Sequence, residues 1–135
     1  MVERKQHPHH FLSTEEKRKI IEAIRAAERD TTGEIRIHLD RRVRGDVMDW
    51  AKKVFQRQRM HQRKQRNAVL IYLSLADRSF AILGDEGIHQ RVSDSFWKGI
   101  AQSMQRYFSR DQFLEGLEHA LHEIGEELKK HFAIP

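Results

Sequence analysis

The sequence predicts an α/β fold, in which a small mixed β-sheet flanked by about four helices forms a three-layer α/β/α sandwich. Residues 68–73 are almost continuously apolar, which is typical of a strand buried on both faces. Residues 34–39 alternate between apolar and polar side chains, which indicates a strand with one buried face. Segments with helical periodicity surround both strands, so helices are expected on the two faces of the sheet.

The first helix is expected to begin after Ser13, because Ser13 and Glu16 have the spacing of a capping box. It should run to about Asp30, and residues 31–33 should end it. Its buried stripe is formed by Ile20, Ile24 and Ala27.

The strand over residues 34–39 is expected at an edge of the sheet, because only one of its faces is apolar. Asp46 is a suitable N-cap for a second helix that runs to about His61. The apolar stripe of that helix comprises Val47, Trp50, Ala51, Val54 and Phe55.

The second strand, residues 67–75, is expected at the centre of the sheet, with the third strand over residues 79–83 beside it. The gap between them is so short that the pair should form an antiparallel hairpin. The first two strands are joined through a helix, and a right-handed crossover makes them parallel.

Three helical segments are expected after the sheet. A single turn is predicted near residues 88–92, and Ser93 or Asp94 should cap a helix that continues to about Tyr107. Asp111 is expected to open the last helix, whose apolar stripe extends to about residue 131.

Composition narrows the class of protein. A chain of 135 residues with 39% hydrophobic and 33% charged residues is typical of one soluble domain, expected over residues 11–132 after a disordered arm at residues 1–10. The absence of cysteine excludes disulfides, thiolate zinc sites and a cysteine nucleophile. The first ten residues do not resemble a signal peptide, and no apolar run has transmembrane length. We therefore expect a cytoplasmic monomer that does not insert into membranes.

Carboxylates gather where strand ends should meet. The third strand stops at Gly84, and Asp85 and Glu86 follow at once in a tight loop. With the predicted topology, this loop lies at the same sheet edge as Glu34 and Asn67, while Asp94 is nearby at a helix cap. Carboxylate and amide oxygens are the ligands that Ca²⁺ and Mg²⁺ prefer. The alternative is a polar turn whose carboxylates only favour the following helix N-terminus.

A second candidate site is a basic segment. Between residues 41 and 66 there are ten Lys or Arg against Asp46 and Asp49, which gives a local charge of +8. Such a segment can attract polyanions such as nucleic acid, although it can also be a solvated surface. No aromatic residue lies between 57 and 66, so binding should be weak and independent of base sequence. The candidate residues are Lys52, Lys53, Arg57, Arg59, Arg63, Lys64 and Arg66.

Other catalytic arrangements find little support. Glu115, His119, His122 and Glu126 share one face of the last helix, but that face is opposite its apolar stripe and should be exposed. No serine lies in a nucleophile elbow, and no glycine-rich phosphate loop is present. Asp40 and Asp77 are expected to serve as turn or cap residues at the opposite edge of the sheet.

Several short motifs, taken in order, resemble the TPM domain family, whose name joins a thylakoid lumen phosphatase, a photosystem II repair protein and an acetylcholine-receptor modulator. The motifs lie at residues 32–35, 66–71, 77–78, 82–88 and 108–117, and the resemblance as a whole extends from about Phe11 to Phe132. The resemblance implies an α/β/α sandwich, divalent-cation binding in some members, and acid phosphatase activity in plant members.

The leading functional prediction is therefore a divalent-cation-binding domain with Asp85 and Glu86 as ligands and Glu34 and Asn67 in support. A bound cation could hold a phosphorylated small molecule or protein, which leaves metal-dependent phosphatase activity open. The alternatives are a non-catalytic module for polyanions and a protein-interaction domain.

Overall fold

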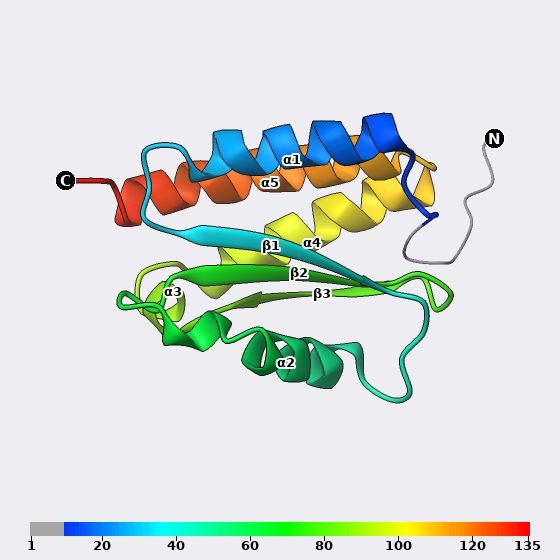
Figure 1. Ribbon diagram of the computed structural model, residues 1–135, viewed down its shortest axis with the longest axis horizontal. Coiled ribbons are helices and arrows are strands. Elements are labelled where there is room, and N and C mark those ends of the chain that lie inside the picture. The colour runs from blue at the N-terminus through cyan, green and yellow to red at the C-terminus, as the bar shows by residue number, and fades with distance from the viewer. Residues whose placement is uncertain (1–9) are drawn as a thin grey trace.

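Three strands form one mixed sheet in the order β1–β2–β3 in the computed structural model, which describes residues 10–135 (Figure 1). The predicted pairing is confirmed: β1 is parallel to β2, and β3 is antiparallel to β2. The elements are α1 (Thr14–Glu28), β1 (Glu34–Asp40), α2 (Val47–Arg57), the 3₁₀ turn η1 (Met60–Gln62), β2 (Ala68–Ser74), β3 (Ser79–Gly84), α3 (Glu86–His89), α4 (Asp94–Ser109) and α5 (Phe113–His131).

The sheet lies between two helical layers, as the sequence predicts. Figure 1 shows α1, α4 and α5 on one face and α2 on the other. All seven residues of β2 are buried. Val69 and Ile71 contribute to the core under α1, α4 and α5, whereas Leu70 and Tyr72 contribute to the smaller core under α2. The strand β2 therefore has no solvent face, which explains its continuous apolar sequence.

Local signals set most helix starts. Ser13 and Glu16 form the predicted capping box. The Glu16 amide donates to Ser13 Oγ at 3.1 Å, and the Ser13 amide donates to Glu16 Oε1 at 3.0 Å. Asp46 caps α2 by accepting hydrogen bonds from the amides of Met48 and Asp49. Ser93 is the N-cap of α4.

Several predicted boundaries were wrong by a few residues, and left-handed backbone conformations coincide with them. Helix α2 ends at Arg57 rather than near His61, because Arg59 has a φ of 58° and α-helical geometry cannot continue through it. Asp30 and Asp111 also have positive φ, so α1 stops at Glu28 and α5 begins after Gln112 rather than at Asp111. The one-turn helix near residue 88 begins earlier, at Glu86.

Two predictions about the chain ends have separate outcomes. The expected disordered arm lies outside the described residues except for His10, which is in a turn. Among the described residues, none of the helices is both long and apolar enough to cross a lipid bilayer.

Helices α1 and α5 approach closely through small residues. A Cβ built at Gly125 would lie 2.7 Å from Ala27 Cα and 3.0 Å from Ala27 O, so a methyl group there would have to separate the two helices. By contrast, a Cβ at Gly99, which is exposed on α4, would meet nothing within 4 Å.

The two glycines give a matched test of this close packing. Gly125→Ala should destabilise the protein by about 1–2 kcal/mol, because overpacking outweighs the gain in helix propensity. Gly99→Ala should raise stability by up to about 1 kcal/mol, because only the propensity gain applies. Urea unfolding followed by circular dichroism measures both, and equal effects of the two substitutions would contradict the packing of α1 on α5.

Candidate functional site

Three strand ends meet at one edge of the sheet, as the predicted topology requires. Glu34 begins β1 opposite Ala68 of β2, and Gly84 ends β3 opposite Val69 of the same strand. The loop residue Asp85 continues this ladder, because its amide donates to the Ala68 carbonyl at 3.0 Å. The start of β1, the start of β2 and the Asp85 loop therefore share one small region.

Asp85 pairs with Arg66, which the sequence analysis did not assign, and it caps α3, in agreement with the alternative of a polar turn before a helix. Its carboxylate accepts hydrogen bonds from Arg66 Nε at 2.7 Å and Arg66 Nη2 at 2.9 Å, which is a bidentate ion pair. It also accepts from the Glu86 amide at 2.8 Å and so forms the N-cap of α3. The Asp85 side chain is only 6% exposed, whereas that of Arg66 is 42% exposed.

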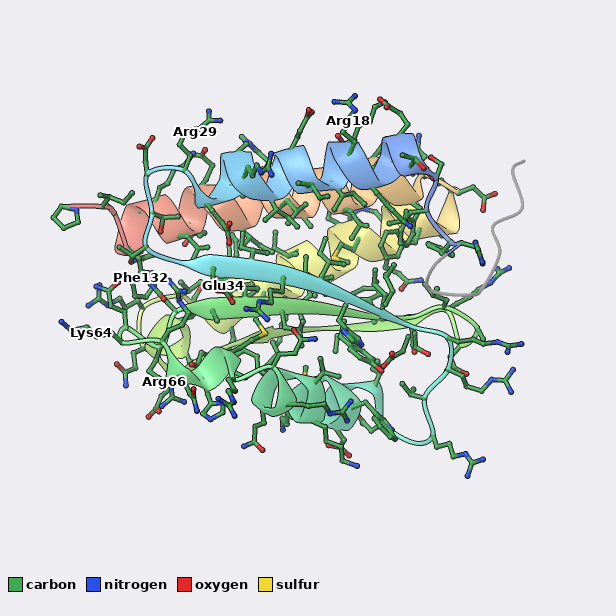
Figure 2. The ribbon with its side chains drawn as sticks, in the orientation of Figure 1. Arg18, Arg29, Glu34, Lys64, Arg66 and Phe132 are labelled. Carbon is green, nitrogen blue, oxygen red and sulfur yellow. The ribbon has the colours of Figure 1, made fainter. Side chains whose placement is uncertain are left out.

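Glu86 shares Arg66 with Asp85, whereas Glu34 belongs to a second set of contacts around Arg63. Glu86 Oε2 lies 3.4 Å from Arg66 Nη1, and its side chain is exposed. Arg63 donates to Asn67 Oδ1 at 3.1 Å, to Glu34 Oε2 at 3.3 Å and to the Thr32 carbonyl. We call Glu34, Arg63, Arg66, Asn67, Asp85 and Glu86 the sheet-end cluster; Figure 2 shows Glu34 and Arg66 at the same end of the sheet.

The backbone brings the arginines into place. Arg66 has a φ of 52°, an uncommon left-handed conformation for a residue with a side chain, directly before β2. A Cβ at Gly87 would overlap the Gln65 carbonyl and lie 2.7 Å from that of Arg66. Glycine is thus needed at position 87 so that α3 can approach the loop before β2 closely, rather than to supply an unusual φ.

Electrostatics favour the charged form of Asp85. Burial alone raises the pKa of this carboxyl, but the hydrogen bonds from Arg66 and the Glu86 amide outweigh burial and hold the pKa below its usual value. The hydrogen bond to Asp85 correspondingly raises the pKa of Arg66. Asp85 is therefore a buried, fully ionised carboxylate at neutral pH.

Of the five residues predicted as metal ligands, Asp85 and Glu86 share Arg66, and Glu34 and Asn67 share Arg63, but no side-chain hydrogen bond or ion pair among the described residues joins the two pairs. Glu34, Asn67, Asp85 and Glu86 lie in the sheet-end cluster. Asp94 is exposed in the first turn of α4, and no hydrogen bond or ion pair between described residues joins it to the other four. Within residues 10–135, no group of three or more His, Asp and Glu side chains has an arrangement that could hold a metal ion.

His61 is a further neighbour that sequence reasoning missed. Its Nδ1 is buried and has no hydrogen-bond partner among the described atoms. Its electrostatic contribution is the smallest of the causes that hold the pKa of Asp85 low. The alternation and capping patterns in the sequence do not signal His61, because it belongs to the irregular segment after α2.

The predicted polyanion residues divide into two groups. Arg63 and Arg66 are partly buried in the sheet-end cluster. The other members are exposed on the α2 side of the molecule and have no ion pair among the described residues: Lys52, Lys53, Arg57, Arg59 and Lys64.

The opposite end of the sheet carries a separate polar network. Asp40 accepts hydrogen bonds from the buried Tyr72 hydroxyl and lies 3.1 Å from His38 Nε2, while the His38 ring stacks on Tyr72. Burial and the nearby Asp40 raise the pKa of Tyr72. Asp77 has the expected turn role, because it accepts from the Val43 amide and the Ser74 hydroxyl.

Two remaining features lie away from the sheet-end cluster. On α5, Glu115, His122 and Glu126 are exposed, and the half-buried His119 lies 5.6 Å from the ring of Tyr107. An open depression of about 450 Å³ is formed between the start of α4 and the end of α5, and it includes Phe96 but none of the predicted ligands.

Comparison with known proteins decides the family. The sequence profile of the TPM domain family, described as TPM_phosphatase, matches residues 6–127. This chain belongs to the TPM domain family. Among curated proteins, none matches the chain.

Three solved structures are similar to this chain in fold. The NMR structure of the BA42 protein from the psychrophilic bacterium Bizionia argentinensis is 41% identical, with a TM-score of 0.87 over 92% of this chain and 86% of that chain. An N-terminal domain from P. gingivalis is similar in fold at 17% identity and a TM-score of 0.70, covering 92% of this chain and 83% of that one. An N-terminal domain of the cg2496 protein from Corynebacterium glutamicum is similar in fold at 14% identity and a TM-score of 0.66, and the match covers 87% of this chain and 74% of that one.

The buried ion pair should contribute to stability in a pH-dependent way. Asp85→Asn should lower the unfolding free energy at pH 7 by about 1–3 kcal/mol, the range for loss of a hydrogen bond to a charged group. Asparagine can still cap α3, so the change isolates the carboxylate charge. Because the folded-state pKa of Asp85 is below the unfolded value, the difference should be full above about pH 5 and disappear as pH falls through the folded-state pKa.

Chemical denaturation of both proteins between pH 3 and pH 7 measures this difference. Glu86→Gln is the matched control, because its carboxylate contacts the same Arg66 from an exposed position and should contribute about 0.5 kcal/mol or less. If the difference in unfolding free energy between the wild type and Asp85→Asn did not change with pH, Asp85 would not be an ionised partner of Arg66.

Proposed function

We propose that this TPM domain binds a divalent cation, Ca²⁺ or Mg²⁺, at the sheet-end cluster. Asp85 and Glu86 are the ligands, and Glu34 and Asn67 support them. The observation that carries the proposal is a buried carboxylate, Asp85, whose bidentate counter-ion is a substantially exposed arginine side chain.

The donor chemistry fits such a cation. Asp85 and Glu86 offer two carboxylates, and these hard oxygen donors suit Ca²⁺ and Mg²⁺ better than metals that prefer sulfur or imidazole, while Glu34 and Asn67 stay bonded to Arg63. Asp85 and Glu86 are adjacent in sequence, so a single ion can reach both without a large backbone change. Water would complete the coordination, as is usual for Mg²⁺.

Arg66 must leave Asp85 before a cation can bind there. Its guanidinium neutralises one charge, whereas a divalent ion would neutralise the two charges of Asp85 and Glu86. The Arg66 side chain is 42% exposed, so it can move into water without opening the core. The cation has to replace both hydrogen bonds from Arg66 to Asp85, and we therefore expect reversible binding that is weakened by this competition.

We further propose that the cation bound at this site takes part in phosphate-ester hydrolysis. A bound cation supplies a Lewis acid that can hold and polarise a phosphoryl group of a small molecule or protein. Arg66, once released from Asp85, and Lys64 at the same end of the sheet would add positive charge for the phosphate oxygens (Figure 2). Asn67 and Glu34 would remain hydrogen-bonded to Arg63 and so keep the start of β1 and β2 together.

A cation titration followed by ¹⁵N NMR tests binding. In the wild-type protein, Ca²⁺ or Mg²⁺ should shift the amides of residues 63–68 and 85–88 in a saturable way. Asp85→Asn with Glu86→Gln should abolish these shifts, because both charged ligands are lost. Arg66→Gln should tighten binding, since it removes the guanidinium that competes with the cation for Asp85.

The matched control is Asp49→Asn with Asp94→Asn, which removes the same charge from exposed positions outside the cluster. This control should bind the cation as the wild type does. Saturable shifts that persist in the Asp85/Glu86 double variant would place the site elsewhere. A wild-type protein that shows no shifts would refute the proposal.

Phosphatase activity, where it is measured with p-nitrophenyl phosphate, should depend on the same ion. EDTA should abolish it, excess Mg²⁺ or Ca²⁺ should restore it, and the Asp85/Glu86 double variant should lose it. Activity that survives both EDTA and the double substitution would show that the sheet-end cluster is not its source.

A further inference from the structure

The two helical layers differ in charge. The exposed cations of the α2 layer are Lys52, Lys53, Arg57, Arg59 and Lys64, which we call the α2 basic face. In the opposite layer, α1 has four glutamates against four Lys or Arg, and α5 has five glutamates against two lysines. Charge is therefore distributed unevenly between the two sides of the sheet, and the excess positive charge lies on the α2 side.

The cations of the α2 basic face are free to bind a partner. None of them forms an ion pair with another described residue, in contrast to Arg63 and Arg66, which are engaged with carboxylates. Lys53 Nζ lies 4.5 Å from the centre of the Trp50 ring, and this contact orients its side chain without neutralising it. Asp49 is the only acidic residue between Val47 and Arg66.

The exposed side chains of the α2 layer indicate which class of polyanion this face would bind. The large hydrophobic side chains that are exposed among the described residues are Ile21 and Ile134, and they belong to α1 and to the segment after α5 rather than to the α2 layer. The aromatic ring beside the α2 basic face is that of Trp50, which is half-buried and covered by Lys53, so it does not offer a free surface on which single-stranded bases could stack. The α2 basic face also has no exposed large apolar side chain that could anchor it in a bilayer.

We propose that the α2 basic face docks on the phosphate backbone of double-stranded nucleic acid. Helix α2 has 11 residues and is thus about 16 Å long, and η1 extends the face further, so it can span several phosphates of a duplex. Lysine and arginine contacts of this kind position a protein on a duplex without reading its sequence. This proposal uses residues outside the sheet-end cluster and is independent of cation binding.

Fluorescence anisotropy with two 20-base-pair duplexes of unrelated sequence tests the proposal. Both should bind with similar affinity at low salt, and log Kd should change with log salt with a slope of roughly 3 to 5, as expected for about four or five phosphate contacts. Lys52→Glu with Arg57→Glu should weaken binding and reduce that slope by about 2. These two residues avoid the ion pairs of Arg63 and Arg66, so folding should be retained.

The matched control is Lys98→Glu with Arg106→Glu, which reverses two exposed charges on α4 in the opposite layer and should leave duplex affinity nearly unchanged. Equal weakening by both double variants would mean that net charge, and not this face, drives binding. Tighter binding to a 20-nucleotide single strand, or binding only to vesicles that contain phosphatidylglycerol, would overturn the duplex proposal. Absence of duplex binding at low salt would overturn it as well.

Discussion

Burial of β2 on both faces is the constraint on which the rest of the molecule depends. All seven residues of this strand are buried, so a helical layer has to cover each side of the sheet. The crossover through α2 then makes β1 parallel to β2, and the short turn after Ser74 makes β3 antiparallel. This combination places the starts of β1 and β2 and the end of β3 at one edge, where the sheet-end cluster forms.

Within that cluster, Asp85 has a structural role and is at the same time the centre of the proposed site. It caps α3, it accepts two hydrogen bonds from Arg66, and its loop is held close to residues 65–66 because Gly87 has no side chain. A sequence reading that made Asp85 only a helix-capping residue would therefore be correct but incomplete. The proposed exchange depends on the exposed position of Arg66, because an arginine enclosed by the core would hold the carboxylate permanently.

The sequence predicts the parts of this structure that depend on periodicity and short-range capping. The buried strand, the edge strand, the hairpin and the caps at Ser13 and Asp46 follow from such patterns, and so does the meeting of Glu34, Asn67 and Asp85 at one edge. The partners of the carboxylates do not follow, because Arg66 reaches Asp85 across 19 positions from a left-handed backbone conformation that no local pattern announces. For the same reason Arg63 and Arg66 were grouped with the solvent-facing cations, although both lie in the cluster.

The proposed site requires a divalent cation and Arg66 to compete for Asp85. The most direct measurement is the ¹⁵N resonance of the Arg66 Nε–H group during a Mg²⁺ or Ca²⁺ titration. We expect this resonance to move toward the position of a solvated arginine, with the same titration midpoint as the amides of residues 85–87. If the cation shifts those amides while the Arg66 resonance stays unchanged, or if neither responds, Asp85 is not the exchangeable ligand described above.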